Sequence, residues 1–241
     1  MQIRDIVNES ADLDNATEAE QIAAVTTNYE QIKYIKNPSE AVQLAAVTAF
    51  GEALRWIKNP SDQVKWAAVN SPGADYALKY IKNPSPELQL AAVKTCGNAI
   101  RYVKNPSLEL QLIAVGKKYN RGSQWSIRYI TDPSLAVQLA AVENSGFQLK
   151  SIKNPGLRVQ LAAVRTTPSV IIDIKDPPRQ VAMVALLGLL AMYQSNDWHG
   201  QQVSKYYLEQ QLQRLHRLHP DWEELQDIAD ESGFKLKKGR R

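Results

Sequence analysis

Cysteine, histidine and long apolar runs are all scarce in this sequence. Cys96 is the one cysteine, so no disulfide can form within the chain, which favours a reducing compartment. His216 and His219 lie three residues apart, but no third ligand accompanies them, so we expect no metal site. The longest apolar run, residues 181–192, is shorter than the roughly 20 residues that cross a bilayer. These absences predict a cytoplasmic protein with no membrane contact and no cofactor.

Catalytic motifs are missing as well. The sequence has no serine, histidine and aspartate in a triad-like order, no glycine-rich turn between strand and helix, and no evident pair of carboxylates. Gly116-Lys117-Lys118 lacks the hydroxyl residue and the upstream glycine of a phosphate-binding loop. An enzyme built on helical repeats would need an acidic residue in its groove, and the sequence identifies none. We therefore predict no catalytic residue and a protein that is not an enzyme.

A repeat dominates what is present. Asn-Pro or Asp-Pro pairs recur, with prolines at positions 38, 60, 84, 106, 133, 155 and 177, in steps of 22, 24, 22, 27, 22 and 22 residues. Each pair is followed by an apolar stretch such as Val42-Gln43-Leu44-Ala45-Ala46-Val47 and then by a shorter apolar stripe. A fixed period in this range is typical of a solenoid, whose units bury their apolar faces by stacking.

One repeat contains two expected helices, of about three turns and about two turns. We expect Asn37 to cap the first helix, Pro38 to be its first residue, and Glu40 to reach back as in a capping box. Gly51 is expected to break this helix before the second one. A glutamine recurs at one place in the apolar stretch and is expected to bond the backbone of a neighbouring junction: Gln21, Gln43, Gln89, Gln111, Gln138 and Gln160.

The predicted fold is all-α: a right-handed α-solenoid of about eight 22-residue two-helix repeats with a C-terminal helical cap. Residues 1–15 are an acidic N-terminal cap, 16–193 the helical-repeat solenoid, 194–234 the C-terminal helical cap and 235–241 a basic tail. The leucine stripe between Leu208 and Leu218 is expected to cover the last repeat. A homodimer through residues 198–219 is the alternative.

The pattern Asn-Pro-Ser-x-x-Val-Gln-Leu-Ala-Ala-Val, followed by Gly-x-Ala-Leu-x-x-Ile, resembles leucine-rich-variant and other HEAT-like repeats. It also resembles a repeat family of unknown function in bacteriophage and bacterial proteins, which shares Ala-Val-x-x-x-Gly-x-Ala-Leu, here residues 46–54. The likeness covers residues 16–190. It implies a right-handed stack of α- and 3₁₀ helices and a phage-like, host-interacting protein or inhibitor, but assigns no residue a role.

Cations and aromatic residues recur at the end of successive repeats. We call this set the basic–aromatic ladder: Lys33, Tyr34, Lys36, Arg55, Trp56, Lys58, Lys79, Tyr80, Lys82, Arg101, Tyr102, Lys104, Arg128 and Tyr129. Stacking would place equivalent members in a row, about 8–10 Å apart. A second candidate is the insertion with Lys117, Lys118, Tyr119 and Arg121, because insertions in solenoids often form contact loops.

The ladder admits three interpretations. Its lysines could offset helix dipoles while its rings wedge between repeats, in which case it is only structural. As a binding face, it predicts a non-catalytic module that recognises a protein with an acidic surface. The alternative partner is nucleic acid, whose phosphates and bases suit cations interleaved with rings.

Overall fold

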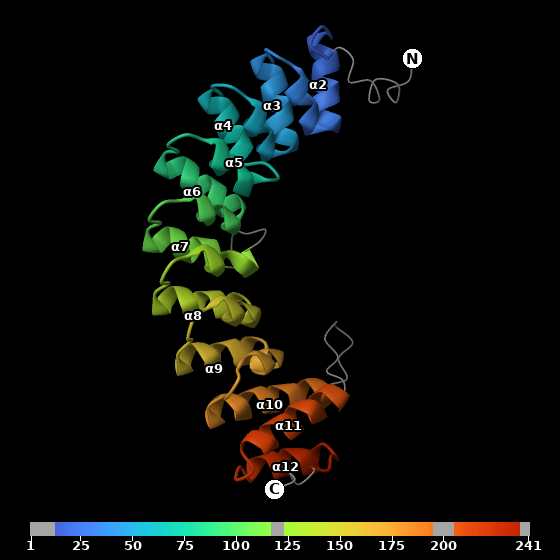
Figure 1. The fold of residues 1–241 in the computed structure, drawn as a ribbon, viewed down its shortest axis with the longest axis vertical. Helices are drawn as coiled ribbons and strands as arrows, with labels where there is room; N and C mark the ends of the chain where they lie inside the picture. The colour runs from blue at the N-terminus through green and yellow to red at the C-terminus, as the bar shows by residue number, and fades with distance from the viewer. Residues whose placement is uncertain (1–12, 117–122, 195–204, 237–241) are drawn as a thin grey trace. The chain divides into compact units, whose positions relative to one another are not determined.

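The computed structural model describes residues 13–116, 123–194 and 205–236. These residues form helices and no strand, which confirms the all-α prediction (Figure 1). None of the described helices is long and apolar enough to cross a membrane. The chain divides into two compact units, residues 1–132 and 133–241, and each is described by itself.

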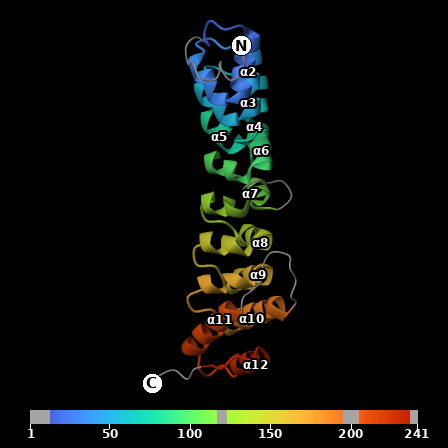
Figure 2. The ribbon, with the colours of Figure 1, turned by 90° about the vertical axis from the view of Figure 1, so that its right-hand side faces the viewer.

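The first unit alternates α-helices with 3₁₀ helices, which are labelled η, except that the short α-helix α5 stands where the third 3₁₀ helix would be. Its elements are α2 (Glu18–Thr27), η1 (Tyr29–Tyr34), α3 (Glu40–Ala49), η2 (Gly51–Trp56), α4 (Asp62–Val69), α5 (Ala74–Tyr80), α6 (Pro86–Thr95), η3 (Gly97–Tyr102), α7 (Leu108–Val115) and η5 (Ser123–Tyr129). Each α-helix packs on the next one, and η1 packs on η2 as η3 packs on η5. Helices α2, α3, α4, α6 and α7 therefore line one side of this unit, and the 3₁₀ helices line the other together with α5, which packs on η2 and η3 (Figure 2).

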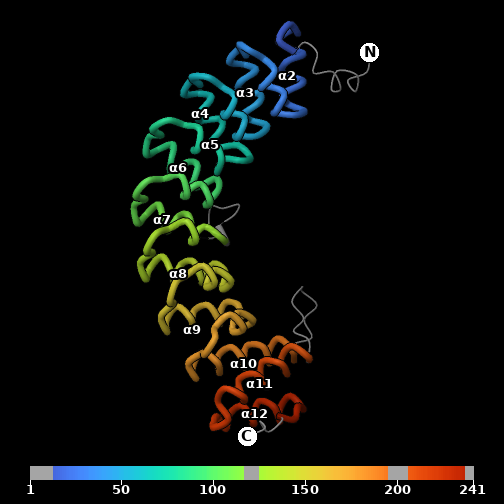
Figure 3. The backbone as a smooth tube through the Cα atoms, viewed as in Figure 1, coloured from blue at the N-terminus to red at the C-terminus, as the bar shows by residue number. Residues whose placement is uncertain are grey.

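The second unit begins with an alternation of α-helices and 3₁₀ helices and ends with two longer α-helices and a shorter one. It contains α8 (Leu135–Asn144), η6 (Gly146–Ser151), α9 (Leu157–Thr166), η7 (Pro168–Asp173), α10 (Arg179–Gln194), α11 (Lys205–Leu218) and α12 (Glu224–Glu231). Helix α8 packs on α9, α9 packs on α10, and η6 packs on η7 (Figure 3). Both units thus bury their helices by packing each pair on the next.

The helix core uses the same positions in each repeat. In α3, Val42, Ala46 and Val47 are fully buried, and the equivalent residues of α8 and α9 are too. The alanine lets neighbouring helices approach closely. Burial of small and β-branched side chains between helices explains why this stretch is apolar nearly all round.

The junctions differ from the predicted capping. Helix α3 begins at Glu40 and is capped by Ser39, whose hydroxyl accepts a hydrogen bond from the Val42 amide at 3.3 Å. The prediction that Asn37 caps this helix is therefore wrong. The same serine cap recurs at Ser61, Ser85, Ser107 and Ser134.

The residue before the proline has a different task at most junctions. The backbone is left-handed, with φ between 47° and 52°, at Asn59, Asn83, Asn105, Asp132 and Asn154. Asparagine and aspartate tolerate this conformation better than other residues that carry a Cβ. They turn the chain between repeats and leave the capping to serine.

The predicted capping box at Glu40 is also absent. Its carboxylate instead accepts a hydrogen bond from the Ser61 hydroxyl of the next repeat, and Glu18 pairs with Ser39 in the same way. A capping box does form at the start of α2, between Thr17 and Glu20. Glu40 therefore links two repeats rather than closing its own helix.

Gly51 starts η2, and its role is close packing. A Cβ there would lie 2.5 Å from the carbonyl oxygen of Ala68 in α4. A Cβ on Gly146 would likewise lie 2.5 Å from the carbonyl oxygen of Ala163 in α9. Both glycines let a 3₁₀ helix touch the α-helix of the following repeat.

The glutamine prediction is confirmed. The Gln43 side-chain amide donates to the Pro38 carbonyl at 2.9 Å, so it ties the helix to the junction that precedes it. Equivalent bonds run from Gln89, Gln111, Gln138 and Gln160 to Pro84, Pro106, Pro133 and Pro155. Gln21 reaches the Leu13 carbonyl instead.

The leucine stripe of α11 is used within the second unit. Leu208, Leu212 and Leu215 are fully buried, and α11 packs on α10. The Arg214 guanidinium donates to the Ile171 carbonyl at 3.1 Å and to the Lys175 carbonyl at 3.2 Å, at the end of η7. A homodimer through residues 198–219 would therefore need side chains other than these leucines.

Candidate functional site

Five of the nine ladder cations lie over aromatic rings. Four of them cover the ring that follows them directly in sequence, at 4.7–5.3 Å from its centroid: Lys33 over Tyr34, Arg55 over Trp56, Lys79 over Tyr80 and Arg101 over Tyr102. Arg128 lies over Trp125 instead, at 5.1 Å. Cation–π pairing thus holds charges and rings together along the short helices.

Arg101 is the most enclosed of these cations. Its guanidinium lies 4.8 Å from the Tyr76 ring centroid and 5.6 Å from that of Tyr129, besides the contact with Tyr102. It forms a 3.2 Å ion pair with Asp75, whose side chain is 16% exposed. Burial lowers the pKa of Arg101, but the tyrosines and Asp75 outweigh it and raise that pKa. Arg101 therefore joins successive repeats and is less available to a partner.

Two other ladder cations are paired with acidic neighbours on their own short helix. Lys33 lies 3.3 Å from Glu30, and Arg55 lies 3.4 Å from Glu52. The hydrogen bond to Glu30 is the main reason that the pKa of Lys33 is raised. These side chains are partly exposed, so each ion pair fixes its cation only weakly.

The lysine before the junction asparagine is more accessible. Lys36 forms a 2.9 Å ion pair with Asp14, and this hydrogen bond is the main cause of the lowered pKa of Asp14. Lys58, Lys82 and Lys104 are exposed and form no ion pair with any residue that the structure describes. The first unit thus presents three positive charges in equivalent positions that its own acidic residues do not neutralise.

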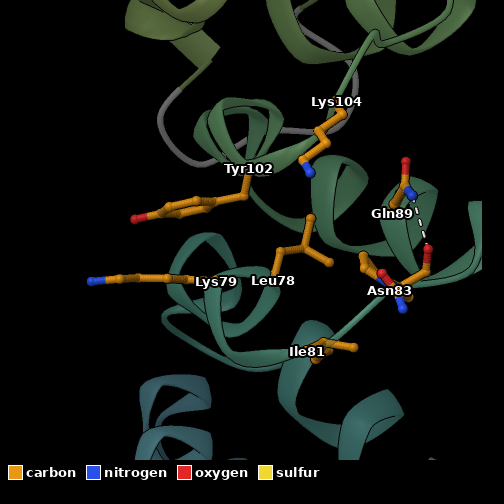
Figure 4. A pocket seen from close by; sticks show the side chains of 8 residues that line it. Leu78, Lys79, Ile81, Asn83, Gln89, Tyr102 and Lys104 are labelled. Carbon is orange, nitrogen blue, oxygen red and sulfur yellow. Dashed lines mark hydrogen bonds between the residues drawn. The ribbon is translucent and has the colours of Figure 1, made fainter.

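A hollow of about 480 Å³ lies beside two of the ladder lysines, and we call it the first hollow. Its lining is Leu78, Lys79, Ile81, Asn83, Pro84, Gln89, Tyr102 and Lys104. Lys79 and Tyr102 extend side by side toward one side, while the Lys104 ammonium points inward over Leu78 (Figure 4). Gln89, on the opposite side, donates to the Pro84 carbonyl at 2.9 Å. The lining combines an apolar floor with two lysine side chains, of which Lys104 directs its ammonium inward, and it contains no carboxylate.

The second unit contains an equivalent hollow of about 400 Å³, the second hollow. Its lining is Leu149, Lys150, Ile152, Asn154, Pro155, Gln160, Asp173, Ile174 and Lys175. Asp173 stands at the repeat position of Tyr102, and its carboxylate lies 3.2 Å from the Lys150 ammonium. The second hollow therefore neutralises one of its two lysines.

Some contributors to these sites were missed from sequence. Tyr76, Asp75 and Trp125 lie outside the repeated two-residue pattern and reach the ladder only through folding. Asp173 marks where the ladder ends in sequence, but its pairing with Lys150 required the structure. The predicted contact loop, with Lys117, Lys118, Tyr119 and Arg121, lies outside the described residues.

The histidine and cysteine side chains that the sequence offered as candidates for chemistry are held within the fold. His219 lies 2.9 Å from Asp176 and stacks on Trp222 with a centroid separation of 3.8 Å. Cys96 is half-buried, and burial is the main cause of its raised thiol pKa. Across residues 13–116, 123–194 and 205–236, no three side chains of the metal-binding types cluster closely enough to hold an ion.

No protein-family model matches this chain, and no curated protein or solved structure matches it either.

Proposed function

We propose that the repeats build a right-handed α-solenoid of about eight 22-residue units, closed by the C-terminal helices. The support is the repeated packing of each helix pair on the next within both units. Serine caps, left-handed junction residues and junction-bonding glutamines at the same repeat positions add to it. We further propose that this protein works in the cytoplasm, since one half-buried cysteine suits a reducing compartment.

We propose that the protein is a non-catalytic binding module for a protein with an acidic surface. One observation carries the proposal: Lys58, Lys82 and Lys104 are exposed and form no ion pair with a described residue. Positive charges held in a row complement acidic groups on a partner and raise the rate of encounter. The partner would therefore contact the ends of the short helices in the first unit.

The ring contacts favour a protein partner over nucleic acid. Single-stranded binding depends on bases that stack on open aromatic faces. Here, each of the ladder rings Tyr34, Trp56, Tyr80 and Tyr102 already has a cation over one face. Nucleic acid is the second candidate because Tyr34 and Trp125 remain 44% and 37% exposed beside cations.

The test compares a labelled glutamate-rich peptide with single- and double-stranded DNA and RNA, by fluorescence anisotropy at two salt concentrations. We expect the peptide to bind and the triple variant Lys58→Gln, Lys82→Gln, Lys104→Gln to bind about tenfold more weakly. A matched triple in the second unit, Lys153→Gln, Arg158→Gln, Arg165→Gln, should keep nearly full affinity. Tight DNA or RNA binding with a steep salt dependence, and none to the peptide, would make nucleic acid the partner.

A further inference from the structure

We propose that the first hollow is a seat for one carboxylate, an aspartate or glutamate side chain of the acidic partner. This inference rests on the proposed function and makes it specific. It assigns the seat to Lys79 and Lys104, from two successive repeats, with Tyr102 beside them. The other ladder lysines would then add general attraction rather than a defined contact.

The lining fits a carboxylate on a short aliphatic stem. The ammonium of Lys104 points into the hollow, and Lys79 borders the same space (Figure 4). Neither lysine forms an ion pair with a described residue. The buried side chains of Leu78 and Ile81 form an apolar floor that suits methylene groups. An ammonium group directed over an apolar floor, with a second lysine at the border of the hollow, matches an acidic side chain in both charge and shape.

The second hollow shows which group such a site accepts. There the chain supplies its own carboxylate, because Asp173 pairs with Lys150 at 3.2 Å. Lys150 occupies the repeat position of Lys79, and Asp173 occupies that of Tyr102. The first hollow has the same lysines and the same apolar floor but lacks this internal acid. An acidic side chain from outside would supply the charge that Asp173 supplies in the second unit.

Exchanging the acid between the hollows tests the seat. Tyr102→Asp gives the first hollow an internal carboxylate and should weaken binding of the labelled glutamate-rich peptide about fivefold or more, the size of one well-formed exposed ion pair. The matched control Tyr102→Asn removes the same ring without adding charge, so it should weaken binding clearly less than Tyr102→Asp does. Circular dichroism of each variant checks that it is folded.

The reciprocal change is Asp173→Asn, which frees Lys150 in the second hollow. Titration calorimetry should then detect a second, weaker peptide site, whereas Asp173→Glu, which keeps the charge, should bind one peptide as the unchanged protein does. A gain of binding cannot result from unfolding. It therefore supports the proposal even if the Tyr102 variants are unstable.

The outcomes separate the seat from the proposed function. If the unchanged protein does not bind the peptide, both are overturned. If it binds but Tyr102→Asp binds equally well, or Tyr102→Asn loses as much affinity as Tyr102→Asp, the acidic partner stands and the carboxylate seat is wrong. The absence of a second site in Asp173→Asn would also count against the seat, because that hollow would then have the lysines but no affinity.

Discussion

The two hollows share their construction and differ in charge. Each is lined by an apolar pair, an asparagine–proline junction, a glutamine that bonds this junction and two lysines. One position separates them chemically: it holds Tyr102 in the first unit and Asp173 in the second. The repeat therefore keeps the positions that pack and leaves a surface position free to set the charge of the site.

A second pair of equivalent positions also differs between the two units. Arg101 in the first unit lies among three tyrosine rings and pairs with a mostly buried aspartate. Lys150 in the second unit has an exposed ion pair and no ring contact that the structure describes. The cation at this repeat position is therefore enclosed by other side chains in the first unit, whereas it is a surface charge in the second.

The largest expected effect concerns what the units have in common. Gly51→Ala and Gly146→Ala should each lower the free energy of unfolding by about 3 kcal/mol, because the new methyl group meets a backbone carbonyl that cannot move aside. Urea unfolding followed by circular dichroism measures this loss. The control is Gly156→Ala, where no atom lies within 4 Å and the change should be small. A mild effect at only one of the two glycines would show that the units do not pack alike.

Next in size is the contrast between the two cations. Arg101→Ala should cost about 2 kcal/mol, because it removes the partner of Asp75, which is 16% exposed, and leaves three rings without their central contact. Lys150→Ala should cost less than about 1 kcal/mol, since its pair with Asp173 is exposed. Thermal unfolding of both variants checks the order. Equal losses would remove the distinction between the units.

A smaller gain is expected at the start of α9, where Gly156 stands at the position of the capping serines. Gly156 has the extended backbone of the capping serines, with φ −68° and ψ 166°, but offers no side-chain acceptor. Gly156→Ser should therefore stabilise α9 by about 0.5–1 kcal/mol. The converse change, Ser134→Gly at the start of α8, should destabilise by a similar amount. Unfolding midpoints that do not move would mean that this cap is unimportant.

The smallest expected effect depends on pH. The Thr17 backbone amide is the main cause of the lowered pKa of Glu20 in the first unit, and the backbone amide of Glu224 is the main cause of its own lowered pKa in the second, followed by Arg179. A lowered pKa stabilises the fold above the unfolded value, near pH 4, and this contribution disappears as the pH falls through the folded value. Glu20→Gln and Glu224→Gln should therefore lower the melting temperature slightly at pH 7 and not at pH 3. A difference that persists at pH 3 would point to lost packing instead of lost charge.

Much of the fold was predictable because packing leaves a periodic trace in sequence. Valine and alanine recur where helices are buried, and the glutamine at position 43 and its equivalents bonds a junction as expected. The capping prediction failed at Asn37 because Ser39, two residues later and directly before the helix, is the better-placed acceptor. Local preference alone does not decide between two neighbouring capping residues.

The sequence by itself determined the helices, their order and the spacing of the ladder, because apolar periodicity and proline position act within one repeat. Only the tertiary structure decided which ladder charges are free. Arg101 is enclosed by residues from successive repeats, and Lys150 is neutralised by an aspartate 23 positions along the chain. Such contacts join different repeats, so their energy depends on stacking. The residue pattern within a single repeat therefore does not predict these contacts.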